Sequence, residues 1–392
     1  MKKKFYNGII CAVMLSIPVS SFAAISLRSR ALEKFRKKTE NFKEKAAVRE
    51  FVVERQAVIQ DFDSDKKEDS VEENSEDFKL PPDPPEQGPG SGEYSYEELK
   101  NGLYEVGTAY EYWIFEPKSA EGVQLPLIMF NHGWYFGKHP NTYRAWIEHM
   151  VKRGNIVVFP AFQENARTSP SLFTLNALGA LRKAIARLLN EEGHAMPDLN
   201  KFATIGHSAG GIIAANIAAM ASRENIPRPK AVMAINPGNS WAGHPLEDMS
   251  DVPRGTLLAV MAAEKDNLAF MYDAKRIFYE ATEVLPEDKN LIIIPTDKKG
   301  TPDLTANHFA PCGVKTEAGF TRGFDVNGLD YYGYWKIFDG LTDAAFYNKN
   351  RRYALGNTPE QRYMGTWSDG EPIKELIVIT DPNPKNFSAY HK

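Results

Sequence analysis

The sequence contains little cysteine and has no strong excess of charge of either sign. Its 392 residues include 2 cysteines, and the formal net charge at pH 7 is -4. No basic run with interleaved aromatic residues follows the N-terminal region, so nothing indicates a nucleic-acid partner. The hydrophobic share of 43% and the charged share of 25% are typical of a globular protein with a sizeable core.

No apolar run near the N-terminus is long enough to cross a membrane. The apolar stretch 9–19 is shorter than the roughly 20 residues that a bilayer requires. Three lysines precede it, and the small residues Ser21 and Ala23 follow at the positions that a signal peptidase reads. We therefore predict a signal peptide over residues 1–23 and export to the periplasm or the extracellular space. The mature chain would have no transmembrane segment and would keep only Cys312, so it would have no internal disulfide.

The next segment is highly charged and poor in apolar residues. Residues 28–55 are rich in Lys, Arg and Glu, and residues 61–77 are mostly Asp and Glu. We interpret residues 24–79 as a partly helical or disordered tether, with attachment to a cell envelope through residues 28–79 left open. The stretch "LPPDPPEQGPGSG" then predicts a proline- and glycine-rich linker over residues 80–94.

From residue 95 to the end, short apolar runs alternate with segments of helical length. The alternation predicts an α/β fold in which helices cover both faces of a mostly parallel sheet. Residues 173–190 place leucines and an isoleucine on one stripe, which predicts an amphipathic helix. The predicted strands are residues 110–117, 126–133, 155–162, 202–208, 231–238, 256–266 and 291–297.

The stretch "FATIGHSAGG", residues 202–211, places Ser208 among three glycines between a predicted strand and a predicted helix. Glycine destabilises the interior of both elements, so its repetition indicates a tight turn. A strand, a sharp turn and a helix are the context in which G-x-S-x-G forms a nucleophile elbow. We predict that Ser208 is a nucleophile exposed at the carboxyl edge of the sheet.

A serine nucleophile needs a base and an acid that orients the base. In folds that carry the G-x-S-x-G elbow, the acid follows the serine along the chain and the histidine follows the acid. His308 is the predicted base, because His391 lies in the terminal tail and His244 precedes the acids of the strand 256–266. Asp266 is the preferred acid, and its neighbour Glu264 remains an alternative. A third acid, Asp303, is predicted to be a turn residue.

The sequence also offers candidates for an oxyanion hole and a substrate cleft. "FNHGWYFG" follows a strand, and the amides of Trp134 and Ala209 are the predicted oxyanion donors. Tyr135, Phe136 and Trp241 are predicted to contact substrate, with burial in the core as the alternative. Two histidines near this loop, His132 and His139, lack further ligands at metal-binding spacing, so we predict no metal and no other cofactor.

These motifs resemble the α/β-hydrolase superfamily over about residues 95–347. "NHGW", "GHSAGG", "EKD" and "NHFAP" are most similar to the branch of cutinase-like polyester hydrolases, platelet-activating-factor acetylhydrolase-like lipases and chlorophyllase-like esterases. The resemblance implies a metal-independent serine hydrolase that cleaves carboxylic esters through an acyl-enzyme. A small-molecule or lipid-like ester is the implied substrate.

Two other functions remain open, as does the role of the C-terminal region. An acyltransferase would use the same three residues, and a non-catalytic envelope-binding module would use the same fold. Residues 329–347 predict an aromatic helix and residues 373–380 a late strand. The chain beyond about residue 348 is predicted to be an extension of the hydrolase domain.

Overall fold

The structure is a computed structural model, and it describes only part of the 392 residues. The predicted signal peptide and almost all of the predicted charged tether lie outside the described residues, as do Tyr135 and Phe136. The described residues are 79–134, 139–165, 167–238, 240–313, 315–316, 319–320, 325–381 and 383.

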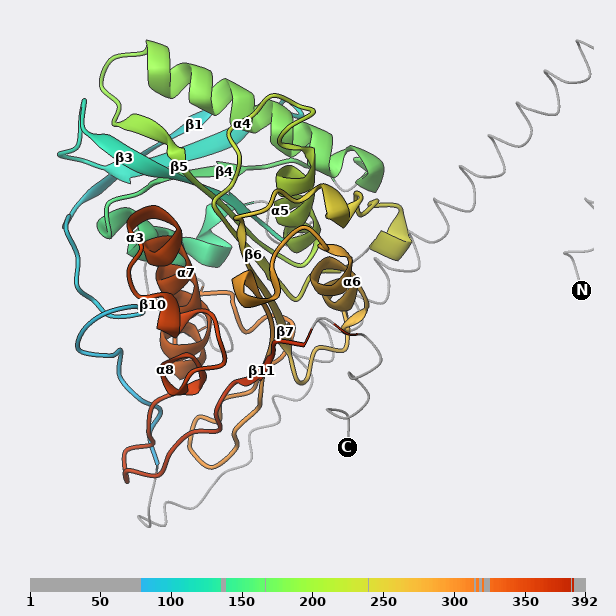
Figure 1. Cartoon of the computed structure of the whole chain (residues 1–392). Coiled ribbons are helices and arrows are strands. Elements are labelled where there is room, and N and C mark those ends of the chain that lie inside the picture. Colours follow the sequence, from blue (N-terminus) through green and yellow to red (C-terminus); the bar gives the residue numbers. More distant parts are fainter. Residues whose placement is uncertain are drawn as a thin grey trace, which may run out of the picture. The chain divides into compact units, whose positions relative to one another are not determined.

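Nine strands of the described chain form one sheet in the order β1-β2-β4-β3-β5-β6-β7-β8-β11 (Figure 1). The six central strands, from β4 to β8, run parallel to one another, whereas β1, β2 and β11 pair antiparallel. The strands are β1 (Leu99–Tyr104), β2 (Tyr112–Pro117), β3 (Gln124–Asn131), β4 (Ile156–Pro160), β5 (Met196–His207), β6 (Ala231–Ile235), β7 (Leu257–Ala263), β8 (Lys289–Ile294) and β11 (Ile377–Ile379).

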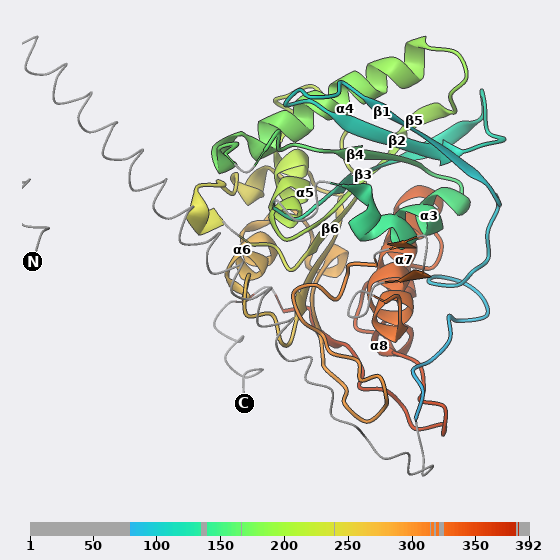
Figure 2. The same ribbon diagram turned by 180° about the vertical axis from the view of Figure 1, so that it is seen from behind.

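Helices cover both faces of this sheet. Helices α3 (Arg144–Lys152) and α7 (Lys336–Tyr347) lie on one face, as seen from the front and from behind (Figures 1 and 2). Helices α4 (Phe173–Asn190), α5 (Ala209–Met220) and α6 (Tyr272–Glu280) lie on the other face. Shorter elements are α8 (Pro359–Arg362), the π-helix η6 (Leu329–Trp335), the ribbon of β9 (Lys315–Thr316) and β10 (Gly319–Phe320), and 3₁₀ turns η1 (Pro140–Tyr143), η2 (Pro170–Leu172), η3 (Ser240–Ala242), η4 (Met249–Asp251), η5 (Pro286–Asp288) and η7 (Arg351–Tyr353).

Strand β6 shows why the strands are apolar along their whole length. Met233 and Ile235 belong to the core on the α3 and α7 face, and Val232 and Ala234 belong to the core on the α5 and α6 face. Alternate side chains of a strand point to opposite faces, so a strand covered on both sides must be apolar throughout. The seven predicted strands and the predicted helix over residues 173–190 are confirmed in position. Strand β1 was not predicted, because its residues "LKNGLY" are mostly polar or half-buried.

The C-terminal region completes the sheet. Strand β11 pairs with β8 in the register Val378 to Ile292, which confirms a strand within the predicted range 373–380. The predicted helix over residues 329–347 is present as η6 followed directly by α7. Of the helices in the described parts of the chain, none combines the length and the apolar character needed to cross a bilayer.

Residues of the predicted linker lie against this C-terminal region. The Leu80 amide donates to the Ser368 hydroxyl, and the Ser368 amide donates back to the Leu80 carbonyl. Farther along, the Gly90 amide donates to Asp339 on α7 at 2.8 Å, and Ser91 is buried. The described part of the linker has no helix or strand before β1, yet its backbone is held by these contacts.

Candidate active site

Ser208 occupies the sharp turn between β5 and α5. Its backbone has φ 58° and ψ -122°, a positive-φ conformation that a non-glycine residue rarely adopts. Hydrogen bonds hold the turn in place, since the Ser208 amide donates to the Ile235 carbonyl at 2.9 Å and the Ser208 carbonyl accepts from the Gly211 amide at 2.9 Å. The predicted exposure of Ser208 is wrong. Its exposed fraction is 1%.

The glycines on either side of Ser208 are required by backbone packing. A Cβ atom at Gly206 would lie 2.0 Å from the Gly210 carbonyl oxygen. A Cβ atom at Gly210 would lie 2.1 Å from the Asn131 carbonyl oxygen at the end of β3. Real Cβ atoms do not approach backbone this closely, so both positions of the G-x-S-x-G motif accept only glycine. This close packing is the reason that glycines surround the serine.

Ser208, His308 and Asp266 form one hydrogen-bonded series. The Ser208 Oγ lies 3.1 Å from His308 Nε2, and His308 Nδ1 lies 2.8 Å from Asp266 Oδ2. All three residues are buried, with exposed fractions of 8% or less. A carboxylate on Nδ1 fixes the ring tautomer in which Nε2 accepts the serine hydroxyl hydrogen.

The surroundings of Asp266 favour its ionised form. Burial by itself raises the pKa of this carboxyl, but the hydrogen bond and charge of His308 and the amides of Leu268 and Ala269 more than offset burial, so the net pKa is lowered. Both amides donate to Oδ1 at 2.9 Å, which leaves Oδ2 for the imidazole.

The other two candidate acids have different partners. Glu264 accepts the Thr296 amide at 2.8 Å and supports the loop after β8. Asp303 accepts the Thr305 hydroxyl at 3.0 Å within its own turn. The structure therefore places Asp266, and neither alternative, against the His308 ring.

The predicted oxyanion residues flank the serine. Ala209 is the first residue of α5, where the amides of the first turn lack partners within the helix. Trp134 follows Gly133, and a Cβ atom at Gly133 would lie 3.3 Å from the Ser208 Cβ. The Gly133 amide donates to the Tyr143 hydroxyl at 3.0 Å, so this amide is already engaged. Its neighbour Trp134 is buried, with its ring 5.6 Å from that of Phe173.

Of the predicted substrate residues, only Trp241 lies in the described chain. It is 58% exposed in η3, the turn after β6, which contradicts the alternative that it is core. Phe270 and Tyr272, which were not predicted, are 62% and 60% exposed in the segment after β7. The two segments are joined, because the Ser240 amide donates to Asp273 at 3.1 Å.

His132 and His139, the two histidines weighed as metal ligands, each have other surroundings. His132 is buried against Phe162 with ring centroids 4.1 Å apart, and His139 directly precedes η1. Within the described ranges, no group of three or more His, Cys, Asp or Glu residues is arranged to hold a metal ion.

Three buried residues that no sequence pattern marked as functional, His207, Asn236 and Tyr143, contact the backbone of Gly133 and His308 or one another. His207 Nε2 and Asn236 Nδ2 both donate to the His308 carbonyl, at 2.7 Å and 3.2 Å. The Tyr143 hydroxyl lies 2.8 Å from His207 Nδ1. The position of His207 within the G-x-S-x-G motif was the one feature of the sequence that could have pointed to it. Nothing in the sequence around Tyr143 marks that residue.

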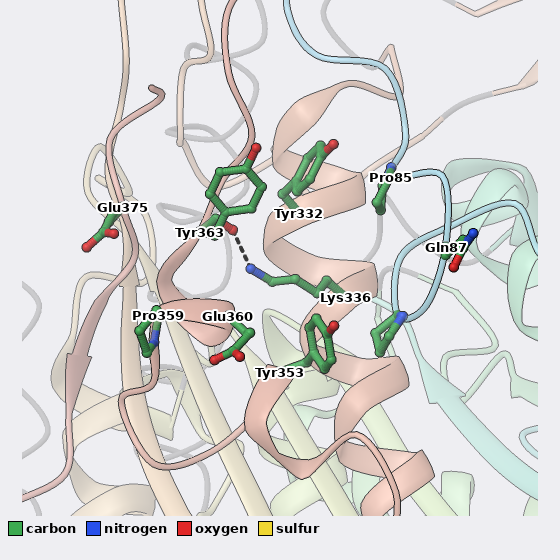
Figure 3. Close-up of a pocket in the computed structure, with 10 residues that line it drawn as sticks. Pro85, Gln87, Tyr332, Lys336, Tyr353, Pro359, Glu360, Tyr363 and Glu375 are labelled. Carbon is green, nitrogen blue, oxygen red and sulfur yellow. Dashed lines mark hydrogen bonds between the residues drawn. The ribbon is translucent and has the colours of Figure 1, made fainter. Parts of the chain in front are cut away.

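A cavity of about 490 Å³ lies elsewhere, between the linker, α7 and the C-terminal segment (Figure 3). At this cavity, Lys336 is buried and donates to the Gln361 carbonyl at 2.9 Å and to the Tyr363 carbonyl. Burial lowers the pKa of Lys336 to about 7. Both acceptors lie at the end of α8, so Lys336 connects α7 to α8. The lining residues are Pro85, Gln87, Pro89, Tyr332, Lys336, Tyr353, Pro359, Glu360, Tyr363 and Glu375.

Comparison with known families agrees with this architecture. Residues 91–244 match the model of the chlorophyllase family, whose fold is that of the α/β-hydrolases. The match includes the Trp134 loop and Ser208 and ends before Asp266 and His308. A search of curated proteins gave no significant match. The predicted α/β-hydrolase fold is confirmed, and the match indicates, at a coarse level, a hydrolase that acts on esters.

Proposed function

We propose that this α/β-hydrolase is a serine esterase that cleaves carboxylic esters through an acyl-enzyme. The observation that carries the proposal is the hydrogen-bonded series from Ser208 through His308 to Asp266, at 3.1 Å and 2.8 Å. The strained turn adds support, because a positive φ at a non-glycine residue is costly and collects at functional sites. The family match, which covers the nucleophile motif, adds further support.

In the first half of the reaction, Ser208 Oγ attacks the ester carbonyl carbon as His308 Nε2 takes the hydroxyl proton. The new imidazolium is stabilised by the ionised Asp266. The carbonyl oxygen becomes an oxyanion, which the amides of Trp134 and Ala209 stabilise. The C–O bond to the alcohol then breaks, and His308 returns its proton to the leaving alkoxide.

In the second half, water takes the place of the alcohol. His308 removes a proton from the water as it attacks the acyl carbon of the Ser208 ester. Collapse of the second tetrahedral intermediate breaks the bond to Oγ and releases the carboxylic acid, and His308 returns the proton to Ser208. Because the same acyl-enzyme would transfer its acyl group to an alcohol in an acyltransferase, product analysis separates the two activities.

The exposed aromatic residues favour esters with an apolar group. Trp241, Phe270 and Tyr272 lie in the segments that follow β6 and β7, at the edge of the sheet where the triad also lies. Such side chains present apolar area to a ligand. A small-molecule or lipid-like ester with an apolar acyl or alcohol group is therefore the proposed substrate.

The proposal includes export of the chain. It rests on the signal-peptide pattern that ends at Ala23, and N-terminal sequencing of the protein recovered from its native host tests it. A mature chain that begins at Ala24 is expected. A chain in which residues 1–23 are retained would contradict the export.

Kinetics on soluble esters test the proposed function. Wild-type protein is expected to hydrolyse p-nitrophenyl esters of short and medium acyl chains and to release the free acid even when an added alcohol is present. Ser208→Ala is expected to abolish the activity. Ser222→Ala, an exposed serine just past the end of α5, is the matched control and should behave as wild type. Unchanged hydrolysis by Ser208→Ala would remove the serine from the mechanism, and an acyl-alcohol product would favour transfer.

A further inference from the structure

A continuous path of hydrogen bonds runs behind the triad from the oxyanion loop to the base. The Gly133 amide donates to the Tyr143 hydroxyl at 3.0 Å, and that hydroxyl lies 2.8 Å from His207 Nδ1. On the other side of the ring, His207 Nε2 lies 2.7 Å from the carbonyl oxygen of His308. Tyr143, His207 and His308 are each 2% exposed or less.

The carbonyl at one end of the path sets the direction of its hydrogen bonds when the His207 ring is neutral. The His308 carbonyl can only accept, so His207 carries its hydrogen on Nε2. A neutral imidazole then offers Nδ1 as an acceptor, and the Tyr143 hydroxyl donates to it. The hydroxyl oxygen in turn accepts the Gly133 amide hydrogen. Each group in the path therefore donates its hydrogen to the next group, from the Gly133 amide to the His308 carbonyl.

At its first end, the path holds the loop that carries a proposed oxyanion donor. Gly133 directly precedes Trp134, and a Cβ atom at Gly133 would lie 3.3 Å from Ser208 Cβ and 3.4 Å from His207 Nδ1. The Gly133 backbone thus fits between the nucleophile and the imidazole of the path. A hydrogen bond that fixes the Gly133 amide also fixes the peptide that follows it.

At its second end, the path holds the base. The His308 carbonyl accepts from both His207 and Asn236, and the rings of His207 and His308 lie 4.7 Å apart. Asn236 also accepts the amide of Ala263, the last residue of β7, at 2.8 Å. Ala263 lies three positions before Asp266, so the segment that carries the acid is tied to the same carbonyl.

We propose that Tyr143 and His207 are positioning residues that fix the oxyanion loop and the His308 backbone relative to each other. The inference rests on the proposed function, and neither side chain is assigned contact with substrate. A displacement of about 1 Å in such a site can cost on the order of a hundredfold in rate. The pair is therefore expected to affect turnover far more than substrate binding.

Four variants test this role by their kcat and KM on one soluble ester. Tyr143→Phe and His207→Leu should each lower kcat about ten- to a hundredfold with a change in KM below about threefold. His207→Gln should keep most of the activity, because an amide can donate to the His308 carbonyl and accept from Tyr143. The double variant Tyr143→Phe/His207→Leu should lose little more than either single variant, since both break the same path.

Tyr334→Phe is the matched control for Tyr143→Phe. Tyr334 is also fully buried, and its hydroxyl makes no hydrogen bond within the described structure. Its loss should leave kcat unchanged. A second measurement is independent of activity, because ¹⁵N spectra of the His207 ring report which nitrogen carries the hydrogen. A protonated Nε2 and an unprotonated Nδ1 are expected.

The outcomes distinguish this inference from the proposed function. If wild type is active and Ser208→Ala is not, but Tyr143→Phe keeps full kcat, the positioning role is overturned and the esterase remains. Additive losses in the double variant, or a His207→Gln variant as poor as His207→Leu, would also overturn the role. A hydrogen on Nδ1 of His207 would overturn the path itself. Wild-type protein that is folded but inactive on every ester would instead overturn the proposed function.

Discussion

Asp266 uses its two carboxylate oxygens for different partners, and this division fixes the expected effect of its amide variant. Asp266→Asn keeps the shape, and its oxygen can still accept the amides of Leu268 and Ala269. Its NH₂ group would then face His308 Nδ1, which favours the tautomer with the hydrogen on Nε2. Turnover should fall at least about a hundredfold, since the same change in the Ser-His-Asp triad of a serine protease costs about 10⁴ in kcat.

Glu264→Gln is the control for that prediction. Glu264 accepts the Thr296 amide, and a glutamine oxygen can accept the same hydrogen, so the loss of turnover should be below about threefold. Both variants are compared at matched thermal stability on one soluble ester. A severe loss in Glu264→Gln beside a healthy Asp266→Asn would assign the acid to the other carboxylate.

Gly210, the residue after Ala209, allows a prediction about stability. Gly210→Ala places a Cβ atom 2.1 Å from the Asn131 carbonyl oxygen, which is rigid strand backbone. The free energy of unfolding should fall by more than about 3 kcal/mol, the upper end of ordinary overpacking. Gly92→Ala is the control, because its Cβ atom would meet only Tyr94 at 3.9 Å. Urea denaturation measures both, and equal stability of the two variants would contradict the close approach.

A local motif and the order along the chain narrowed each choice to a few residues, and the structure brings the preferred three, Ser208, His308 and Asp266, into hydrogen-bonded contact. The burial of Ser208 was not predictable in the same way, since its neighbours include residues far away in sequence, such as Gly133, where a Cβ atom would lie 3.3 Å from the Ser208 Cβ. Tyr143 was missed for the same reason. Its role comes from a hydrogen bond across the fold to His207, and no local pattern of residues encodes such a contact.

His244 connects the helices α4 and α5 with the segment after η3. The Asn216 amide donates to the Thr174 hydroxyl at 3.0 Å, and that hydroxyl lies 3.1 Å from His244 Nε2. His244 is fully buried, and burial lowers its pKa to about 3. An unfolded histidine titrates near 6.5, so the unfolded state binds the proton first as the pH falls. Stability from this group is therefore lost between about pH 6.5 and pH 3.

His244→Gln should reduce that loss. The parent protein should lose up to about 2 kcal/mol through His244 between pH 7 and pH 5, from about 1.4 kcal/mol for each unit of pH below 6.5. The glutamine variant does not titrate, so its free energy of unfolding should fall less over the same range. Urea denaturation at both pH values measures the two slopes. Identical slopes would show that His244 is not held neutral in the folded state.

Sheet elements were predictable where both faces are buried, because such strands are continuous apolar runs. Strand β6, "AVMAI", is an example, and all of its residues are buried. Strand β1 lies at the sheet edge, and its residues "LKNGLY" are half-buried or exposed, so no apolar pattern marked it. Its pairing with β2 is set by backbone hydrogen bonds, which side-chain patterns do not report.

The C-terminal extension is part of the described core. Trp367, Ile373 and Leu376 are buried in the same apolar cluster as α3 and α7. The Trp367 ring packs against Gly300, where a Cβ atom would lie 2.0 Å from Cζ3. Trp367→Ala should therefore lower the free energy of unfolding by about 3–5 kcal/mol.

Ile377→Ala is the control for the extension, since Ile377 is 42% exposed on β11 and should cost less than about 1.5 kcal/mol. Chemical denaturation of both variants measures the difference. A Trp367→Ala protein as stable as wild type would show that the extension is not part of the cooperative core.

Covalent labelling shows whether Ser208 is a nucleophile activated by His308. Wild-type protein incubated with a fluorophosphonate should gain the mass of one phosphonyl adduct, and peptide mapping should place the adduct on Ser208. Ser208→Ala should gain no adduct under the same conditions. Folded wild-type protein that stays unlabelled, or an adduct on another residue that persists in Ser208→Ala, would show that Ser208 is not an activated nucleophile.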